Sequence, residues 1–362
     1  MKETLKKSGE QILLPIIAII IALMVGAVFM LFVGKNPLTA YWTMFYGAFG
    51  SWANFGETLV YITPLIFAGL AVALAFRGGL FNIGVEGQIV FSMLVTAWVG
   101  SAWLALPGWL HGIVTLLMGG LAGALWAGIP GACKAYRGVH EVISSIMMNY
   151  IALFLTHYFV MGPLLAPPGV IPATREIAAA TKFLRFLPPS RANLGIFIAL
   201  FCVALVYILL WRTPLGFSIR AVGKSPEAAH YAGINVKGNL LYAMLISGAL
   251  AGLAGACQVQ GLQYKFLDVF VFTGYGFDGI AVALLGRNHP VGVVLGALLF
   301  GSLTSGALQM QSVAGIPKEV IGIIQAVIIL FVAGYEGLQR WVLPWLQKRR
   351  EIAKEGAAHG LA

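Results

Sequence analysis

The sequence predicts an all-α polytopic membrane protein with about ten transmembrane helices. Hydrophobic residues occupy 59% of the 362 positions, charged residues occupy only 10%, and the mean hydropathy is +0.88. A soluble core of this size does not need so large an apolar fraction, whereas each membrane-spanning helix needs about 20 apolar residues. Glycine, at 45 positions, is frequent enough to let many helix backbones pack closely.

Ten apolar segments follow one another along the chain, and we interpret each as one span. The first runs through residues 11–34 without a charge; it is too long for the apolar part of a signal peptide, so we expect a retained anchor. The others are 59–76, 89–106, 112–132, 142–161, 194–211, 240–259, 276–285, 291–310 and 320–332. Segment 276–285 is too short to cross a bilayer alone, which predicts an interrupted helix.

The two halves of the chain resemble each other weakly. A polar segment interrupted by glycines occurs once in each half, at 78–88 and at 274–290. Five spans in each half would make the halves antiparallel, and interrupted segments at matching positions are typical of a transport path. The sequence therefore predicts an inverted repeat of five plus five spans.

The basic residues predict the orientation, since they accumulate on the cytoplasmic side of membrane proteins. An N-terminus inside places 16 Lys and Arg residues in the cytoplasm and 7 outside. We therefore expect a cytoplasmic N-terminus at 1–10, a membrane domain at 11–335 and a basic cytoplasmic tail at 336–362. The formal charge of +10 then reflects topology and some affinity for anionic lipid, and not nucleic acid binding.

One predicted external loop, 163–192, departs from this charge rule. It is rich in proline and holds four of the seven external cations, Arg175, Lys182, Arg185 and Arg191. Because topology does not explain these charges, we expect an ordered cap on the extracytoplasmic side with a docking role.

Polar residues inside the apolar segments are the candidate functional groups. Asn82, Glu86 and Gln88 lie among four glycines between two spans, and burying a carboxylate at membrane depth costs about 2.5–3.5 kcal/mol on insertion scales. Two interpretations remain open. These side chains line a polar pathway, or Glu86 accepts backbone N–H groups and braces a re-entrant turn.

Two further features allow the same choice between pathway and structure. On the predicted helix 142–161 and its N-terminal flank, Glu141, Ser145, Asn149 and Thr156 fall within roughly 80° of arc. This stripe either lines a pathway or forms interhelical hydrogen bonds. Asp278, beside Phe277, either lines a pore or anchors an interface.

Enzymatic and nucleotide-binding motifs are incomplete. Gly-Lys-Ser at 223–225 lacks the glycine that a phosphate-binding loop requires at Ser218, and His140-Glu141 is followed by Ser144 where a zinc protease needs its second histidine. Three cysteines show neither a disulfide framework nor metal spacing. We therefore predict no catalytic residue, no metal site and no cofactor in this chain.

Several motifs carry a resemblance to a known family. Glu227-Ala228-Ala229, followed by Gly233, is similar to the coupling-loop motif in membrane subunits of ATP-binding-cassette (ABC) importers. Residues 220–236 and 247–256 resemble the superfamily of branched-chain amino acid, ribose and nucleoside permeases. Residues 81–88, 141–150 and 276–286 resemble its nucleoside and simple-sugar permeases, which work with binding proteins of the basic-membrane-lipoprotein type. The likeness covers roughly residues 10 to 335.

This resemblance implies a type II importer-like fold in the bacterial cytoplasmic (inner) membrane. It implies three protein partners: a cytoplasmic ABC ATPase that holds ATP and Mg, a second permease subunit in a heterodimer or homodimer, and an extracytoplasmic binding protein. Nucleosides would cross by alternating access, with the loop 212–239 coupled to the ATPase. The residues expected to line or gate the path are Asn82, Glu86, Gln88, Ser145, Asn149, Phe277 and Asp278.

Two alternatives remain. The same machinery could import a simple sugar or another small polar metabolite, since the binding protein largely selects the cargo. A self-sufficient secondary carrier could instead use Glu86 or Asp278 to couple protons or sodium, and inverted halves with interrupted helices would suit it equally.

Overall fold

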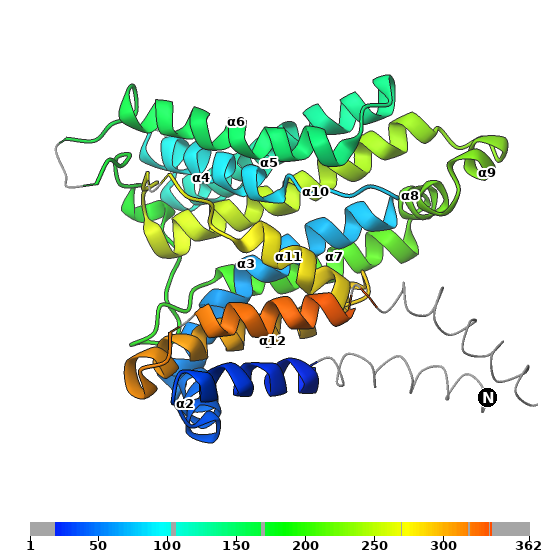
Figure 1. The fold of residues 1–362 in the computed structure, drawn as a ribbon. Coiled ribbons are helices and arrows are strands. Elements are labelled where there is room, and N and C mark those ends of the chain that lie inside the picture. The colour runs from blue at the N-terminus through cyan, green and yellow to red at the C-terminus, as the bar shows by residue number, and fades with distance from the viewer. Residues whose placement is uncertain are drawn as a thin grey trace, which may run out of the picture. The chain divides into compact units, whose positions relative to one another are not determined.

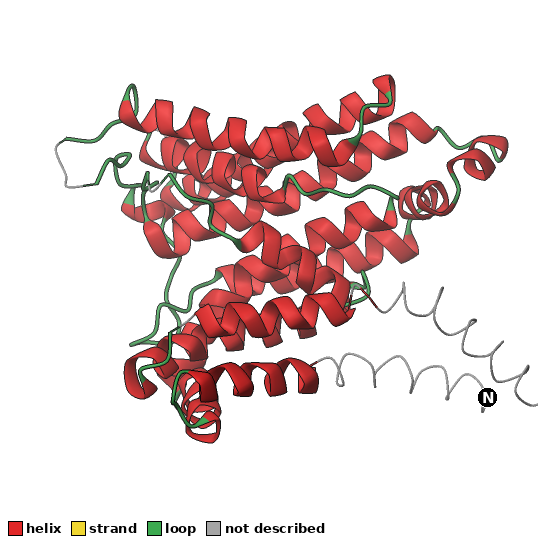
Figure 2. Cartoon of the chain, in the orientation of Figure 1, coloured by secondary structure: helices red, strands yellow, loops and turns green. Residues whose placement is uncertain are grey.

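The computed structural model describes residues 19–102, 106–167, 171–268, 270–317, 319–332 and 334. The predicted cytoplasmic segments 1–10 and 336–362, and the start of the first predicted span, lie outside these residues. The described residues divide into two compact units, those that fall within 1–40 and 314–362 and those that fall within 41–313. Helices account for nearly all the regular structure within the described residues (Figure 2), and pairing of strand type is limited to two isolated β-bridges.

The first unit contains the first and the last apolar helices of the described sequence, Ile19–Phe32 and Glu319–Val332. The former ends where Gly34 adopts a φ of +73°, a conformation that glycine reaches without strain. A further helix that the sequence analysis missed, α2 (Pro37–Phe49), follows this break. Proline at its first position and the Asn36 side chain, which accepts the Leu38 N–H, start it.

The second unit holds residues 41–49 of α2 and the remaining helices (Figure 1). Their bounds are α3 (Trp52–Arg77), α4 (Val85–Ser101), α5 (Gly108–Arg137), α6 (Glu141–Met161), α7 (Gly195–Arg212), α8 (Pro214–Lys224), α9 (Pro226–Tyr231), α10 (Val236–Gln258, continued by a π-helical turn to Gln263), α11 (Tyr275–Leu285) and α12 (Pro290–Gln309). Each of the ten predicted segments overlaps a helix in its described residues. Among the described residues, six helices are long and apolar enough to cross a membrane, or seven counting the broken pair near residue 35, and three apolar helices are shorter.

Helix α3 lies at the centre of the second unit. Its residues 62–75 are buried, and it packs against α7, α10, α11 and α12. Glycines bring α5 and α10 together, since a Cβ on Gly123 would lie 2.6 Å from the Cα of Gly252. This contact agrees with the prediction that glycines let helix backbones pack closely.

The predicted repeat has a counterpart in this unit. A long helix, an irregular link and a short helix occur in the order α3, 78–84, α4 and again in the order α10, 264–274, α11. The two long helices pack on each other, and so do the two short ones. In Figure 1 the loop after α6 and the helices α8 and α9 lie at opposite ends of the unit.

Candidate functional site

Glu86 links the two short helices. It is fully buried in the first turn of α4, and its carboxylate accepts hydrogen bonds from the Thr273 hydroxyl at 2.6 Å and from the N–H groups of Gly274 and Gly276 at 2.8 and 2.6 Å. The N–H groups at the start of a helix lack internal partners and carry partial positive charge, so a carboxylate is favoured there. Glu86 therefore caps α11 from another helix, as the bracing interpretation of the sequence requires.

Gly276 makes this close approach possible. A Cβ at that position would lie 2.5 Å from the backbone nitrogen of Glu86 and 2.7 Å from its Oε2 atom. Any side chain at 276 would therefore separate α11 from the carboxylate, which explains the glycine before Phe277.

Asn82 is the centre of a second set of buried hydrogen bonds. Its amide nitrogen donates to Ser247 Oγ at 2.9 Å and to Gln88 Oε1 at 3.1 Å, and its oxygen accepts from Gly84 N–H and from Gln88 Nε2, both at 3.0 Å. Ser247 in turn donates to the Ala71 carbonyl oxygen at 2.7 Å. The link 78–84 is thereby fixed to both α3 and α10.

Asn149 fixes the same region to α6. Its side-chain oxygen accepts the Gly87 N–H at 2.8 Å, and its amide donates to the Ile83 carbonyl oxygen at 3.0 Å. Ser145 is also buried and donates within its own helix, to the Val142 carbonyl oxygen at 3.1 Å. We call Asn82, Glu86, Gln88, Asn149 and Ser247 the polar junction.

Five of the seven residues predicted to line the pathway are therefore buried in this chain, and a pathway role for them stays a prediction. Phe277 and Asp278 differ, since Phe277 is 44% exposed and Asp278 is only partly buried. Within the part of the chain that the structure describes, the Asp278 carboxylate makes no hydrogen bond or ion pair. Ser247 was missed as a junction member because serine in an apolar, glycine-rich run gives no distinctive signal.

The loop 163–192, predicted to be extracytoplasmic, is ordered by the segment that leads to α11. Backbone N–H groups of Thr174, Ile177 and Phe183 donate to the carbonyl oxygens of Phe266, Tyr264 and Gln260 at 3.0, 2.8 and 2.9 Å. An antiparallel bridge between Ala173 and Leu267 continues this pairing. The loop and the link 264–274 therefore form one hydrogen-bonded layer.

Three of the four loop cations predicted to dock a partner have internal partners. Arg191 pairs with Glu57 at 2.7 Å, and this hydrogen bond raises the pKa of the Arg191 guanidinium. Lys182 pairs with Glu176 at 2.5 Å and lowers the pKa of that carboxyl group, and Arg185 donates to the Tyr264 hydroxyl at 3.1 Å.

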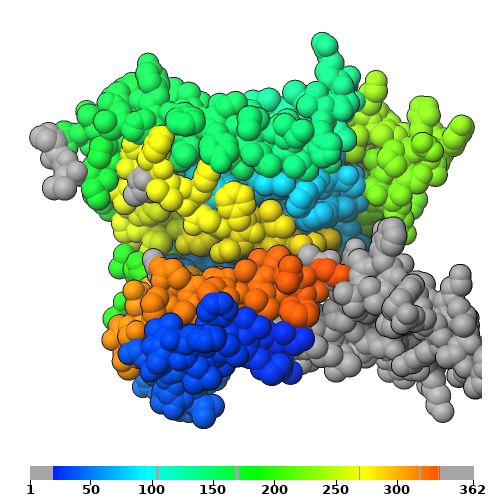
Figure 3. Space-filling view, viewed as in Figure 1, coloured from blue at the N-terminus to red at the C-terminus, as the bar shows by residue number. Residues whose placement is uncertain are grey.

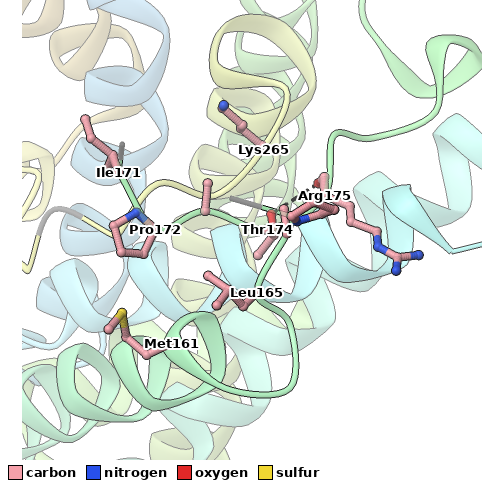
Figure 4. Close-up of a pocket in the computed structure, with 10 residues that line it drawn as sticks. Met161, Leu165, Ile171, Pro172, Thr174, Arg175 and Lys265 are labelled. Atoms are coloured by element: carbon pink, nitrogen blue, oxygen red, sulfur yellow. Dashed lines mark hydrogen bonds between the residues drawn. The ribbon is translucent and has the colours of Figure 1, made fainter. Parts of the chain in front are cut away.

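Arg175 is the exception among the four. It lines a cavity of about 660 Å³ together with Lys265 (Figure 4), and it also borders a second cavity of about 400 Å³ beside Trp98. Among the described residues, no side chain pairs with Arg175. Of the four loop cations, Arg175 is thus the one without a charged partner in the described part of the chain.

The predicted coupling segment lies at the opposite end and forms α9. Ser225 caps it by accepting the Ala228 N–H at 3.2 Å, Glu227 falls in its first turn, and Ala229 is buried. Gly233 ends it with a φ of +79°.

Two glycines connect this end to the polar junction. A Cβ on Gly79 would lie 2.9 Å from the Cα of Gly223, and a Cβ on Gly223 would collide with the Arg77 carbonyl oxygen. The last turn of α8 thus rests directly on the start of the link 78–84.

Comparison with known proteins decides the family. Residues 54–333 match the family described as branched-chain amino acid transport system / permease component. The chain belongs to this permease family. A permease of this kind, with the helices described above, is a multi-pass membrane protein.

Named relatives extend the likeness over nearly the whole permease. The guanosine ABC transporter permease protein NupP of Bacillus subtilis is 45% identical over 95% of this chain and 99% of its own length. The nucleoside ABC transporter permease protein NupB of Lactococcus lactis is 37% identical over 90% of this chain and 91% of its own. The glucose ABC transporter permease protein TsgB13 of Haloferax volcanii is 35% identical over 90% and 88%.

Proposed function

We propose that this permease imports nucleosides as the membrane-spanning subunit of an ATP-driven importer in a bacterial cytoplasmic membrane. The observation that carries the proposal is the 45% identity to a guanosine permease along 99% of that protein. A glucose permease is 35% identical over a similar length, which favours nucleosides over the sugar alternative without removing it.

The partners follow from the same proposal. An ABC ATPase, which holds ATP and Mg, binds at α8 and α9, and a binding protein delivers cargo at the opposite end. A second permease subunit completes the path. The excess of cations on the α8–α9 side supports a cytoplasmic position for it, with both termini inside.

The conformational change that ATP drives passes to the centre of the permease through a short series of contacts. ATPase closure moves α9 and α8, and the glycine contact between Gly223 and Gly79 passes the motion to the link 78–84. Asn82 then carries it through the polar junction to Glu86 and so to the start of α11. Within this chain the route uses the glycine contact of α8, the hydrogen bonds between Asn82 and Gln88 on α4, and the hydrogen bond from Gly276 to Glu86 at the start of the same helix.

The binding protein docks on Arg175 and Lys265. These cations border the outer cavity, whereas Lys182, Arg185 and Arg191 have partners within the chain. An acidic side chain on the binding protein would supply the missing partner. Charges at the rim of an interface mainly steer association.

Reconstitution tests the proposal. Vesicles containing this permease, its permease partner and the ATPase, with binding protein outside, should accumulate labelled guanosine when ATP is enclosed and not when a proton or sodium gradient replaces ATP. Gradient-driven uptake without ATP would support the secondary-carrier alternative and contradict the proposal.

A further inference from the structure

Aromatic side chains from two elements form a continuous row in the second unit. On α6, Tyr150, Phe154 and His157 follow at spacings of four and three residues, so they lie on one face of the helix. The segment 270–277 runs beside this face and contributes Phe270, Phe272 and Phe277.

Three ring contacts join α6 to the segment 270–277. The ring centroids of Tyr150 and Phe272 are 5.5 Å apart, those of Phe154 and Phe270 are 5.5 Å apart, and those of His157 and Phe270 are 4.8 Å apart. Phe272 also meets Phe277 at 6.0 Å. We call Tyr150, Phe154, Phe270, Phe272 and Phe277 the aromatic track.

The track is accessible in the single chain. Tyr150, Phe154, Phe270 and Phe277 are 47%, 58%, 45% and 44% exposed. Figure 3 shows the yellow atoms of the segment leading to α11 on the visible surface beside the green α6. From Tyr150 to His157 the helix rises about 10 Å, so the track runs along the spans toward the extracytoplasmic loop.

Its two ends are polar, which distinguishes it from a lipid-facing surface. Asp278 follows Phe277 at one end and lacks a partner among the described residues. At the other end, the Nδ1 atom of His157 lies 2.5 Å from an Asp268 oxygen, and the His157 side chain is 41% exposed. Carboxylates and half-exposed histidines are costly in hydrocarbon, so this face meets water or a polar solute.

We infer that the aromatic track binds the base of a nucleoside in transit, with Asp278 accepting a hydrogen bond from a base N–H or a ribose hydroxyl. The inference rests on the proposed function and names the residues that meet the cargo. Every base presents a flat π-face, so stacking on aromatic side chains tolerates different bases. The aromatic side chains of the track provide a series of weak contacts, as a transport pathway requires. They do not form one tight binding site.

Photolabelling tests this inference in the purified permease–ATPase complex. An azido-substituted guanosine, activated by light, should attach to peptides containing α6 or residues 270–277. Excess guanosine should prevent the attachment, and excess glucose should not. Attachment elsewhere, or equal protection by glucose, would overturn the inference.

Matched variants provide a second readout. Phe277→Leu and Tyr150→Leu should each raise the guanosine concentration that gives half-protection about tenfold, since each removes a ring on which the base stacks. Phe277→Trp should keep the guanosine concentration for half-protection near the wild-type value. Phe201→Leu removes a 66% exposed ring from α7, away from the track, and should leave it unchanged.

The two proposals fail differently. Absence of ATP-dependent guanosine uptake by the wild-type complex would overturn the proposed function. Normal uptake, with Phe277→Leu and Tyr150→Leu both behaving like Phe201→Leu, would overturn the aromatic track alone. The wild-type labelling map decides the question even where one variant fails to fold.

Discussion

The Oε2 atom of Glu86 accepts the backbone N–H of Gly276 at 2.6 Å, although the two residues are 190 positions apart in the sequence. This bond joins the short helix of the first half to that of the second half. It makes a buried carboxylate the point at which the two interrupted regions depend on each other.

Removing the charge of Glu86 should lower the stability of the permease, because both halves depend on this carboxylate. Glu86→Gln keeps the shape but loses the charge-assisted bonds, each of which contributes about 1.5–3 kcal/mol. We expect a lower melting temperature of the detergent-solubilised permease and a large loss of uptake. Glu176→Gln, which removes an exposed carboxylate of the loop, serves as the control. It should change the melting temperature and the uptake only slightly. Equal effects of the two substitutions would contradict the capping role of Glu86.

The contact between α8 and the link 78–84 should be sensitive to one methyl group. Gly223→Ala places a Cβ against the Arg77 carbonyl oxygen and the Gly79 nitrogen, so α8 must shift. We expect the ratio of guanosine transported to ATP hydrolysed to fall several-fold while the complex still assembles. Gly322→Ala, where a Cβ meets no atom within 4 Å, is the control. An unchanged ratio in Gly223→Ala would remove this contact from the coupling route.

Gly233 should tolerate only residues that adopt a left-handed conformation. Nothing lies within 4 Å of its Cβ position, so backbone strain of about 1–2 kcal/mol, and not crowding, penalises a side chain. Gly233→Val should reduce co-purification of the ATPase, and Gly233→Asn should largely preserve it, because asparagine reaches this conformation more readily. The opposite order would exclude a role for this turn in binding the ATPase.

The loop cations should separate into docking and structural residues. Arg175→Glu should raise the binding-protein concentration for half-maximal uptake, most clearly at low salt, because rim charges act within a Debye length of about 8 Å at physiological ionic strength. Arg191→Glu should instead lower stability, since it opposes Glu57. A docking defect confined to Arg191→Glu would reverse this assignment.

His289 should make the start of α12 sensitive to acid. Burial, and secondarily the charge of Arg77, lowers the pKa of His289, and its neutral Nδ1 accepts the Val291 N–H at 3.3 Å. A histidine with a depressed pKa destabilises the folded state as the pH falls below its ordinary value near 6.5. Melting temperature should therefore decrease from pH 7.5 to pH 5.5, and less in His289→Asn. An identical pH slope in both proteins would assign the effect to other groups.

The helices were predictable because hydropathy is a local property. All ten apolar segments overlap helices, but α2 was missed because its 13 residues are too few for a separate span and Gly34 to Pro37 interrupts the apolar run. The sequence allowed a bracing role for Glu86 as one of two interpretations, but it did not identify the groups that Glu86 contacts. Its partners at 273–276 lie in another part of the sequence, and no spacing indicates that contact.

The polar stripe on α6 illustrates the same limit. Helical periodicity correctly placed Ser145 and Asn149 on one face, yet only the fold shows that this face contacts the start of α4 and that Tyr150 and Phe154 occupy the exposed one. Likewise, the loop cations were counted from the sequence, but their partners were not.

The most direct test of the central claim is the initial rate of ATP-driven uptake of labelled guanosine and labelled glucose by the reconstituted importer, measured side by side. The account predicts saturable guanosine uptake that unlabelled nucleosides inhibit, with no ATP-dependent glucose uptake above vesicles lacking the permease. ATP-driven uptake of glucose without uptake of guanosine would contradict it.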